Sequence, residues 1–247
     1  MNTHTSQAII MRIKEFGESD LLVSFFTPHK GRLKGVAKGA RRSRRRFVNC
    51  LDIFCLSVLE YGLKREGDLC FLHSGKLDDP YSGIRSDFTT LSKASYMIEL
   101  TEILFPWGVA DEKMFHLLKE SLGSLDRGES IEKISIIFEL KAMALGGYGI
   151  NLDACCMCGR AYTGQGVAVY KREKGGIACL NCQQASAVFP KMGSDTVKMM
   201  KTIQSRSSNI MNELDLTHEM MKEMNSILKL HREYHLGMRP KTADYLE

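Results

Sequence analysis

The chain has 247 residues with a formal net charge of +5, and 44% of its residues are hydrophobic and 26% charged. This composition is ordinary for a soluble globular protein and excludes collagen-like and wholly disordered chains. The length suggests one or two domains, and no stretch approaches the ~20 apolar residues that a membrane span requires. Because the start also lacks a secretory signal, we expect a cytoplasmic protein with no membrane partner.

Residues 1–80 alternate short apolar or β-branched runs with turn residues. The runs are Ala8–Ile13, Leu21–Phe26, Leu33–Ala37, Phe47–Leu59 and Leu69–Leu72. Short strands joined by turns within about 70 residues predict a small β-barrel. We favour an OB-fold barrel because the number and length of the strands agree with it, and an SH3-like barrel remains the alternative.

Beyond residue 80 the spacing of apolar residues becomes helical. Three amphipathic patterns come first, with Ser86 or Asp87 as the predicted N-cap of the first pattern and Ser130 as that of the third. Two more helical patterns follow a cysteine-rich region, and their predicted N-caps are Ser194 and Thr217. We therefore expect a helical domain interrupted by a cysteine-rich module.

The cysteine-rich region contains two Cys-x-x-Cys pairs. Cys155 and Cys158 form the first pair, and Cys179 and Cys182 form the second, 20 residues further on. Each pair directs two thiolates to one side of a tight loop, and two pairs complete the tetrahedral sulfur shell that structural Zn²⁺ prefers. We predict one structural Zn²⁺ on these four residues, because four thiolates leave no open position for catalysis. An iron or redox role and unligated thiols are the alternatives.

The predicted fold is α+β and multidomain. An N-terminal OB-fold β-barrel occupies residues 1–80, and an α-helical domain with an embedded four-cysteine zinc-finger module occupies residues 81–247. The module covers about residues 152–186. Four cysteines lie outside the ligand set: Cys156, which we interpret as a spare thiol, and Cys50, Cys55 and Cys70, which we expect in the core.

The net positive charge is concentrated in one segment, Lys30–Arg46, which we call the basic segment. It holds nine basic residues and no acidic one, and the rest of the chain has a net charge of −4. OB barrels bind oligonucleotides across strands two and three and the adjoining loops. We therefore predict that nine residues bind DNA: Lys30, Arg32, Lys34, Lys38, Arg41, Arg42, Arg44, Arg45 and Arg46.

A positive groove binds single strands best when aromatic side chains stack on the bases. Phe25, Phe26, Phe47 and Tyr61 are candidates for stacking, although most aromatic side chains in a small barrel belong to its core. The alternative for the basic segment itself is a solvated, flexible run without a ligand.

Several segments carry a family resemblance, and they follow one another in the expected order. Ala8–Arg12, Phe16–Asp20, Leu22–Thr27 and Gly31–Arg42 resemble the N-terminal signature of the bacterial recombination mediator family RecO. Tyr234–Lys241 resembles the tail of the same family, and the two cysteine pairs with their glycines resemble its zinc module.

The resemblance implies an OB domain, a helical domain with a zinc finger, and a role in DNA repair through the RecF pathway. It also implies binding of single- and double-stranded DNA and annealing of complementary strands. Family members work with RecR to place RecA on DNA covered by the single-strand-binding protein. The implied location is the bacterial cytoplasm, in association with the nucleoid.

The sequence lacks motifs for covalent chemistry. It contains no Walker phosphate loop, no paired acidic motif of a two-metal nuclease, and no ligand or triad spacing among its seven histidines. We therefore predict a protein that is not an enzyme. Two alternatives are a zinc-containing nucleic-acid-processing enzyme and a basic adaptor that binds an acidic protein surface without direct DNA binding.

Overall fold

The computed structural model describes residues 2–63, 69–186, 189–206, 210–237 and 242. Contacts divide the chain into two compact units, Met1–Glu129, called here the barrel unit, and Ser130–Glu247, called the helical unit. The domain boundary predicted between residues 80 and 81 lies where the strands end and the helices begin. As a boundary between domains it stays a prediction. Within the described residues, every helix is too short or too polar to cross a membrane.

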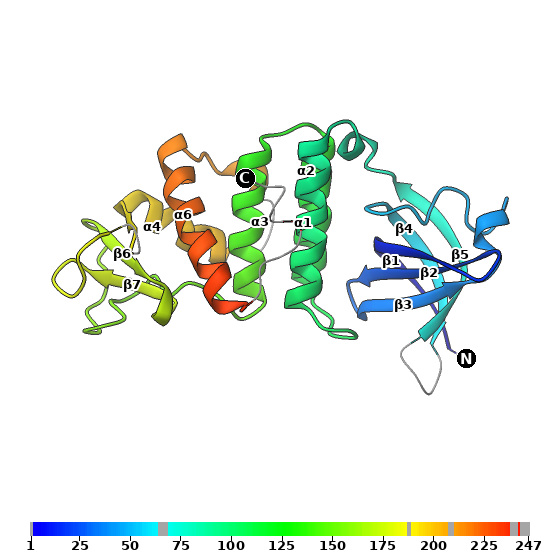
Figure 1. Ribbon diagram of the computed structural model, residues 1–247, viewed down its shortest axis with the longest axis horizontal. Coiled ribbons are helices and arrows are strands. Elements are labelled where there is room, and N and C mark those ends of the chain that lie inside the picture. Colours follow the sequence, from blue (N-terminus) through cyan, green and yellow to red (C-terminus); the bar gives the residue numbers. More distant parts are fainter. Residues whose placement is uncertain (1, 64–68, 187–188, 207–209, 238–241, 243–247) are drawn as a thin grey trace. The chain divides into compact units, whose positions relative to one another are not determined.

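The barrel unit is built on a closed five-stranded barrel, drawn from blue to cyan in Figure 1. Its strands are β1 (Asn2–Phe16), β2 (Asp20–Thr27), β3 (Gly31–Ala37), β4 (Leu56–Leu63) and β5 (Leu69–Asp79). The order around the barrel is β1-β2-β3-β5-β4, in which only the β3–β5 pair is parallel. The number, order and closure of the strands confirm the predicted OB-type barrel.

Alternate strand residues fill the barrel, as the two-residue period of a strand requires. Val23 and Phe25 of β2 belong to the barrel core, whereas Phe26 points to the outer face of the sheet. The core also contains the predicted core cysteines Cys50, Cys55 and Cys70, which are at most 2% exposed.

The predicted strand Phe47–Leu59 is correct only from Leu56 onward. The preceding residues form a loop after a 3-10 helix, η1 (Ala40–Arg42), and two of them, Asn49 and Phe54, have left-handed backbone angles that a strand does not allow. Several apolar residues of this loop, among them Phe47 and Leu51, join the barrel core, whereas Val48 and Ile53 are exposed. The hydrophobicity of the buried residues therefore reflects packing against the barrel rather than pairing within it.

Two helices complete the barrel unit after a 3-10 turn, η2 (Ser82–Arg85). They are α1 (Phe88–Leu104) and α2 (Glu112–Asp126), and aspartate side chains cap both by accepting backbone N–H bonds. The cap of α1 is Asp87, one of the two predicted residues. The outward ring of Phe26 packs against Phe105 and Phe115, with ring centroids 6.2 and 6.3 Å away, and this contact anchors the helices on β2.

The helical unit contains four helices and a small sheet among its described residues. The helices are α3 (Ile131–Leu145), α4 (Ser194–Ser205), α5 (Ile210–Glu213) and α6 (His218–His235). The strands are β6 (Ala168–Lys171), β7 (Gly176–Cys179) and β8 (Lys191–Met192), in the order β7-β6-β8, with a 3-10 turn, η3 (Arg172–Lys174), between the first two.

The predicted caps of this unit are correct at Ser130 and Thr217, whose side chains accept the backbone N–H groups expected of an N-cap. The prediction is wrong at Ser194, which is the first residue inside α4, after Gly193 as the N-cap. The carboxylate of Glu223 on α6 accepts bonds from Gly193 N and Thr196 Oγ. A distant carboxylate therefore fixes the start of α4 in place of a local capping side chain, and the local sequence carries no sign of it.

A buried histidine joins three parts of the helical unit. His231 of α6 is 1% exposed, and its ring nitrogens lie 2.6 Å from the Tyr148 carbonyl oxygen and 2.6 Å from the Tyr170 hydroxyl. Because a carbonyl only accepts, Nε2 carries the proton and Nδ1 accepts from Tyr170. Burial lowers the pKa of His231 to about 4, so the ring is neutral in the folded protein.

We expect acid to destabilise the helical unit through His231. An unfolded histidine binds a proton below a pH of about 6.5, whereas the folded one stays neutral down to its lowered pKa. The stabilisation of the folded state by the neutral His231 ring is therefore complete above pH ~6.5. This stabilisation falls by about 3 kcal/mol as the pH drops to ~4. Denaturant unfolding of wild type and His231→Gln between these pH values measures it.

The difference between the two proteins isolates His231, because other titrating groups contribute to both curves. The free energy of unfolding of His231→Gln should depend less on pH than that of wild type. Parallel curves for the two proteins would contradict the prediction.

Candidate metal centre and nucleic-acid interface

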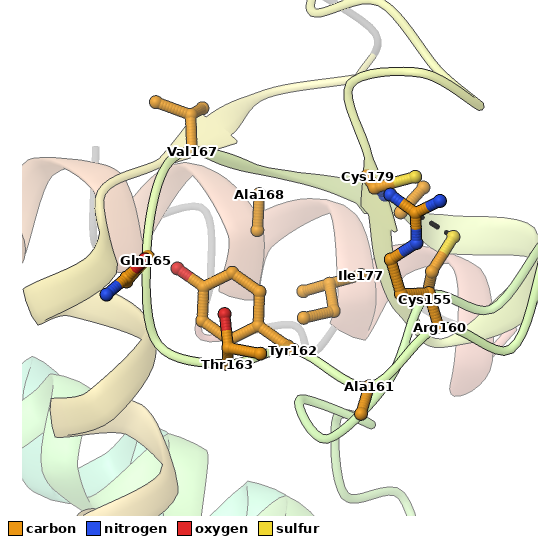
Figure 2. A pocket seen from close by; sticks show the side chains of 11 residues that line it. Cys155, Arg160, Ala161, Tyr162, Thr163, Gln165, Val167, Ala168, Ile177 and Cys179 are labelled. Atoms are coloured by element: carbon orange, nitrogen blue, oxygen red, sulfur yellow. Dashed lines mark hydrogen bonds between the residues drawn. The ribbon is translucent and has the colours of Figure 1, made fainter.

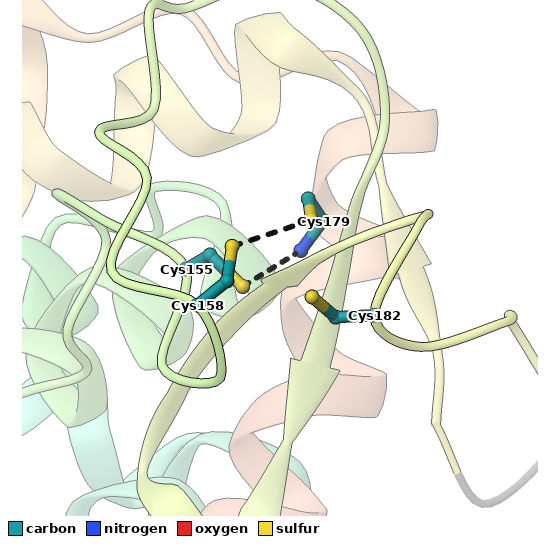
Figure 3. A group of neighbouring side chains, drawn as sticks. All are labelled: Cys155, Cys158, Cys179 and Cys182. Atoms are coloured by element: carbon teal, nitrogen blue, oxygen red, sulfur yellow. Dashed lines mark hydrogen bonds between the residues drawn. The ribbon is translucent and has the colours of Figure 1, made fainter.

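The two predicted cysteine pairs meet at one point of the helical unit (Figure 3). Cys155 and Cys158 lie in the loop after α3, Cys179 ends β7, and Cys182 lies in the turn that follows. All four Sγ atoms lie within 4.8 Å of one another, and those of Cys158 and Cys179 are 3.9 Å apart. The structure thus brings together the four residues whose spacing predicted a metal site.

Each cysteine pair forms a tight turn that directs its thiols inward. Gly159 N donates to Cys155 O at 2.9 Å, and Cys182 N donates to Cys179 O at 2.9 Å. Gly159 has a φ of 73°, a conformation that glycine adopts without a steric cost. The backbone N–H of Cys179 points at Cys155 Sγ, 3.4 Å away, and links the two turns.

The spacing of the four sulfurs fits a metal ion. Tetrahedral coordination with Zn–S bonds near 2.3 Å places sulfurs roughly 3.8 Å apart, close to the 3.9 Å between Cys158 and Cys179. Burial raises the pKa of Cys155, but backbone N–H groups directed at its sulfur outweigh burial and lower the pKa to about 6. Hydrogen bonds with the Cys179 and Cys158 sulfurs raise the pKa of Cys182. A bound cation would favour the thiolate form of all four residues.

A hollow of about 230 Å³ lies beside the cysteine cluster (Figure 2). Arg160, Tyr162 and Gln165 line it, and Cys155 and Cys179 border it. Its volume is below the ~300 Å³ at which small-molecule sites usually begin. The hollow therefore favours a structural role for the cluster over a substrate site.

Eight of the nine predicted DNA-binding residues are exposed on the barrel unit. They come from four consecutive places: the turn between β2 and β3, the outer face of β3, the turn after β3, and η1 with the loop that follows it. In chain order they are Lys30, Lys34, Lys38, Arg41, Arg42, Arg44, Arg45 and Arg46. Their side chains give one continuous stretch of the barrel a positive charge.

Two of these arginines are tethered to the barrel. Arg41 forms an ion pair with Glu15 at 3.1 Å, and Arg46 Nη2 donates to the Lys38 carbonyl oxygen at 2.8 Å. The first contact holds the loop after β3 against β1, and the second lies within the loop. The Arg46 carbonyl oxygen also accepts from Gly75 N of β5 at 2.8 Å. Because exposed ion pairs contribute little stability, Arg41 can exchange Glu15 for a phosphate at small cost.

Arg32 differs from the other eight residues because it is only 8% exposed. Its Nη1 donates to the Glu102 carbonyl oxygen at 2.8 Å, and its guanidinium lies 3.9 Å from the ring centroid of Trp107. Burial lowers its pKa below the ordinary value. Arg32 thus packs β3 against the segment after α1.

The aromatic residues that the sequence suggested for stacking are all internal. Phe25, Phe26, Phe47 and Tyr61 are at most 5% exposed, so their rings are unavailable to a base. The sequence alone could not distinguish these buried aromatic residues from exposed ones, because aromatic residues of both kinds occur in strand-like runs.

Comparisons with known proteins agree along the whole chain. Two family models match: Recombination protein O N terminal, over residues 1–81, and Recombination protein O C terminal, over residues 85–244. The DNA repair protein RecO of Desulfatibacillum aliphaticivorans is 32% identical over 98% of this chain and 96% of its own. That of Syntrophus aciditrophicus is 29% identical over 99% and 95%, and that of Geobacter metallireducens is 35% identical over 76% and 75%.

Proposed function

Since the chain belongs to the recombination protein O family of DNA repair proteins, we propose that it is a recombination mediator of the RecF pathway. In this role it binds single- and double-stranded DNA and anneals complementary strands. It acts by binding and juxtaposing strands rather than by covalent chemistry.

The observation that carries this proposal is the set of eight exposed cations on an OB-type barrel. Lys34 lies on the outer side of β3, within the strand 2–3 face on which OB folds bind oligonucleotides. The other seven lie in the turns and loop next to β3 and extend the positive charge of that face. Neutralising phosphates on two strands at once would reduce the repulsion between the strands and let complementary bases meet. Sequence-independent contacts of this kind suit a protein that must act on any damaged site.

The proposed metal is one structural Zn²⁺ held by Cys155, Cys158, Cys179 and Cys182. Four thiolates in a tetrahedral arrangement select Zn²⁺ or an iron centre, and a closed four-sulfur shell is typical of structural zinc. Bound zinc would hold the loop after α3 and the end of β7 in one position.

The proposed partners follow from membership of the family. They are RecR and the single-strand-binding protein, and through them RecA, which the complex places on single-stranded DNA. The proposed location is the bacterial cytoplasm, in association with the nucleoid.

An annealing assay tests the proposal. Complementary oligonucleotides are mixed at low salt with and without the full chain, in the absence of ATP, and duplex formation is followed over time. We expect faster annealing that weakens as salt rises, with oligonucleotides of unchanged length. An adaptor without DNA binding would fail to accelerate annealing at any concentration, and shortened oligonucleotides would favour a nucleic-acid-processing enzyme.

A further inference from the structure

The chain's only tryptophan lies at the surface of the barrel unit. Trp107 belongs to the segment between α1 and α2 and is 48% exposed. A single exposed apolar side chain is common in soluble proteins and by itself means little. Trp107 differs from such a side chain in two respects: several contacts fix the position of its indole, and cationic residues lie near it.

Backbone contacts fix the segment that carries Trp107 against the start of β3. Gly108 N donates to Arg32 O at 2.9 Å, and Arg32 and Trp107 form an isolated β-bridge. Gly31 has a φ of 64°, and a Cβ atom there would lie 2.0 Å from Val109 O. The close approach of this segment to β3 therefore depends on a glycine at position 31.

Side-chain contacts fix the indole itself. The Arg32 guanidinium covers the ring at 3.9 Å and is held by its bond to the Glu102 carbonyl oxygen. The Glu102 carboxylate in turn accepts three bonds from Arg12 of β1, two from Nε at 2.8 and 3.0 Å and one from Nη2 at 2.5 Å. The indole thus has a charged, hydrogen-bonded support on one side, and nearly half of the residue stays accessible to a ligand.

The surroundings of Trp107 suit a nucleic acid. Arg32 and Lys34 point to the same outer face of β3, and two strand residues span roughly 7 Å. Exposed Lys34 therefore lies roughly 7 Å along β3 from Arg32, the residue that supports the indole, and exposed Lys30 lies in the turn before β3. Two cations for phosphates flank one aromatic surface for a base, on the strands where OB folds bind oligonucleotides.

We propose that the exposed side of Trp107 is a stacking platform for one unpaired base of single-stranded DNA. This inference rests on the proposed DNA-binding function and supplies the base contact that the cations alone do not make. A base inside a duplex is covered on both faces by its neighbours, so the platform favours single strands. Stacking also tolerates any base sequence, as annealing of arbitrary strands requires.

Fluorescence tests the proposal directly, because all tryptophan emission comes from Trp107. The full chain is titrated with a thymine oligonucleotide and with an abasic oligonucleotide of the same length and charge. Binding is followed by anisotropy of a dye on each oligonucleotide. We expect both to bind, and only the thymine oligonucleotide to quench the indole.

Variants separate stacking from folding. Trp107→Leu should weaken binding of the thymine oligonucleotide about 5- to 150-fold, the range of one base–aromatic stack, and leave binding of the abasic one unchanged. Trp107→Phe keeps an aromatic surface and should retain most of the affinity. Phe88→Ala, which removes a 67% exposed ring elsewhere in the barrel unit, is the matched control and should bind like wild type.

The outcomes distinguish this inference from the proposed function. If both oligonucleotides bind equally, without quenching and without loss in Trp107→Leu, stacking is overturned while DNA binding stands. If neither oligonucleotide binds at low salt, both proposals fail. Equal losses for both oligonucleotides in Trp107→Leu would assign Trp107 to packing and overturn the platform.

Discussion

Replacing Cys158 with serine is expected to abolish binding of the proposed zinc ion and to destabilise the cysteine module of the helical unit. Free energies of structural Zn²⁺ binding reach about 10–16 kcal/mol and act as folding free energy. Because a serine hydroxyl does not replace a thiolate ligand, several kcal/mol of that stabilisation should disappear. Cys158 is exposed, so the substitution itself leaves no cavity in a core.

The measurement is metal analysis of protein purified without added metal. Wild type should contain one equivalent of zinc, and Cys158→Ser far less. Cys156→Ser is the matched control, because this neighbouring thiol lies outside the four-sulfur cluster. A wild type that lacks metal, or a Cys158→Ser protein that keeps it, would exclude the proposed zinc site.

Neutralising five arginines of the basic segment should nearly abolish DNA binding at moderate salt. The substitutions are Arg→Gln at Arg41, Arg42, Arg44, Arg45 and Arg46. If all eight exposed cations contact phosphates, the slope of log K against log salt on single strands is roughly −5.6, and the three remaining lysines would give roughly −2. If the two proteins bind equally at 1 M salt, this difference corresponds to roughly three thousandfold weaker binding at 0.1 M salt.

A matched control separates local binding from the effect of net charge. Five exposed lysines of the helical unit are replaced by glutamine in one variant: Lys174, Lys191, Lys198, Lys222 and Lys229. This variant loses the same charge and should keep the wild-type slope. Equal losses in the two variants would mean that binding follows total charge rather than the basic segment.

The sequence predicted those elements whose signal is local. Short apolar and β-branched runs bounded by turn residues located β1, β2 and β3, and the spacing of the two cysteine pairs located the four-cysteine cluster. Asp87, Ser130 and Thr217 marked helix starts because a capping side chain bonds within three residues of itself. Such signals can be read from the sequence because they do not depend on contacts with distant residues.

The predictions failed where contacts with residues distant in the sequence determine the local conformation or the burial of a side chain. The run Phe47–Leu59 has the composition of a strand, yet most of it packs against the barrel as a loop. Arg32 has the same charge as its neighbours, and only the approach of Trp107 and Glu102 from the segment around the end of α1 buries it. Trp107 itself carried no motif, because its proposed role depends on Arg32, which lies far away in the sequence.

Closure of the barrel also determines how the barrel unit folds. Asn2 at the start of β1 pairs with Leu63 at the end of β4, so the β1–β4 ladder that closes the barrel joins segments far apart in the chain. Pairing of this kind forms slowly, because the intervening chain must first lose entropy. Until it forms, β1 and β4 expose unpaired edges that can associate with other chains. The basic segment does not lie on these edges, but its positive charge makes separate barrels repel one another. The cations proposed to attract DNA would therefore also keep newly made barrels apart.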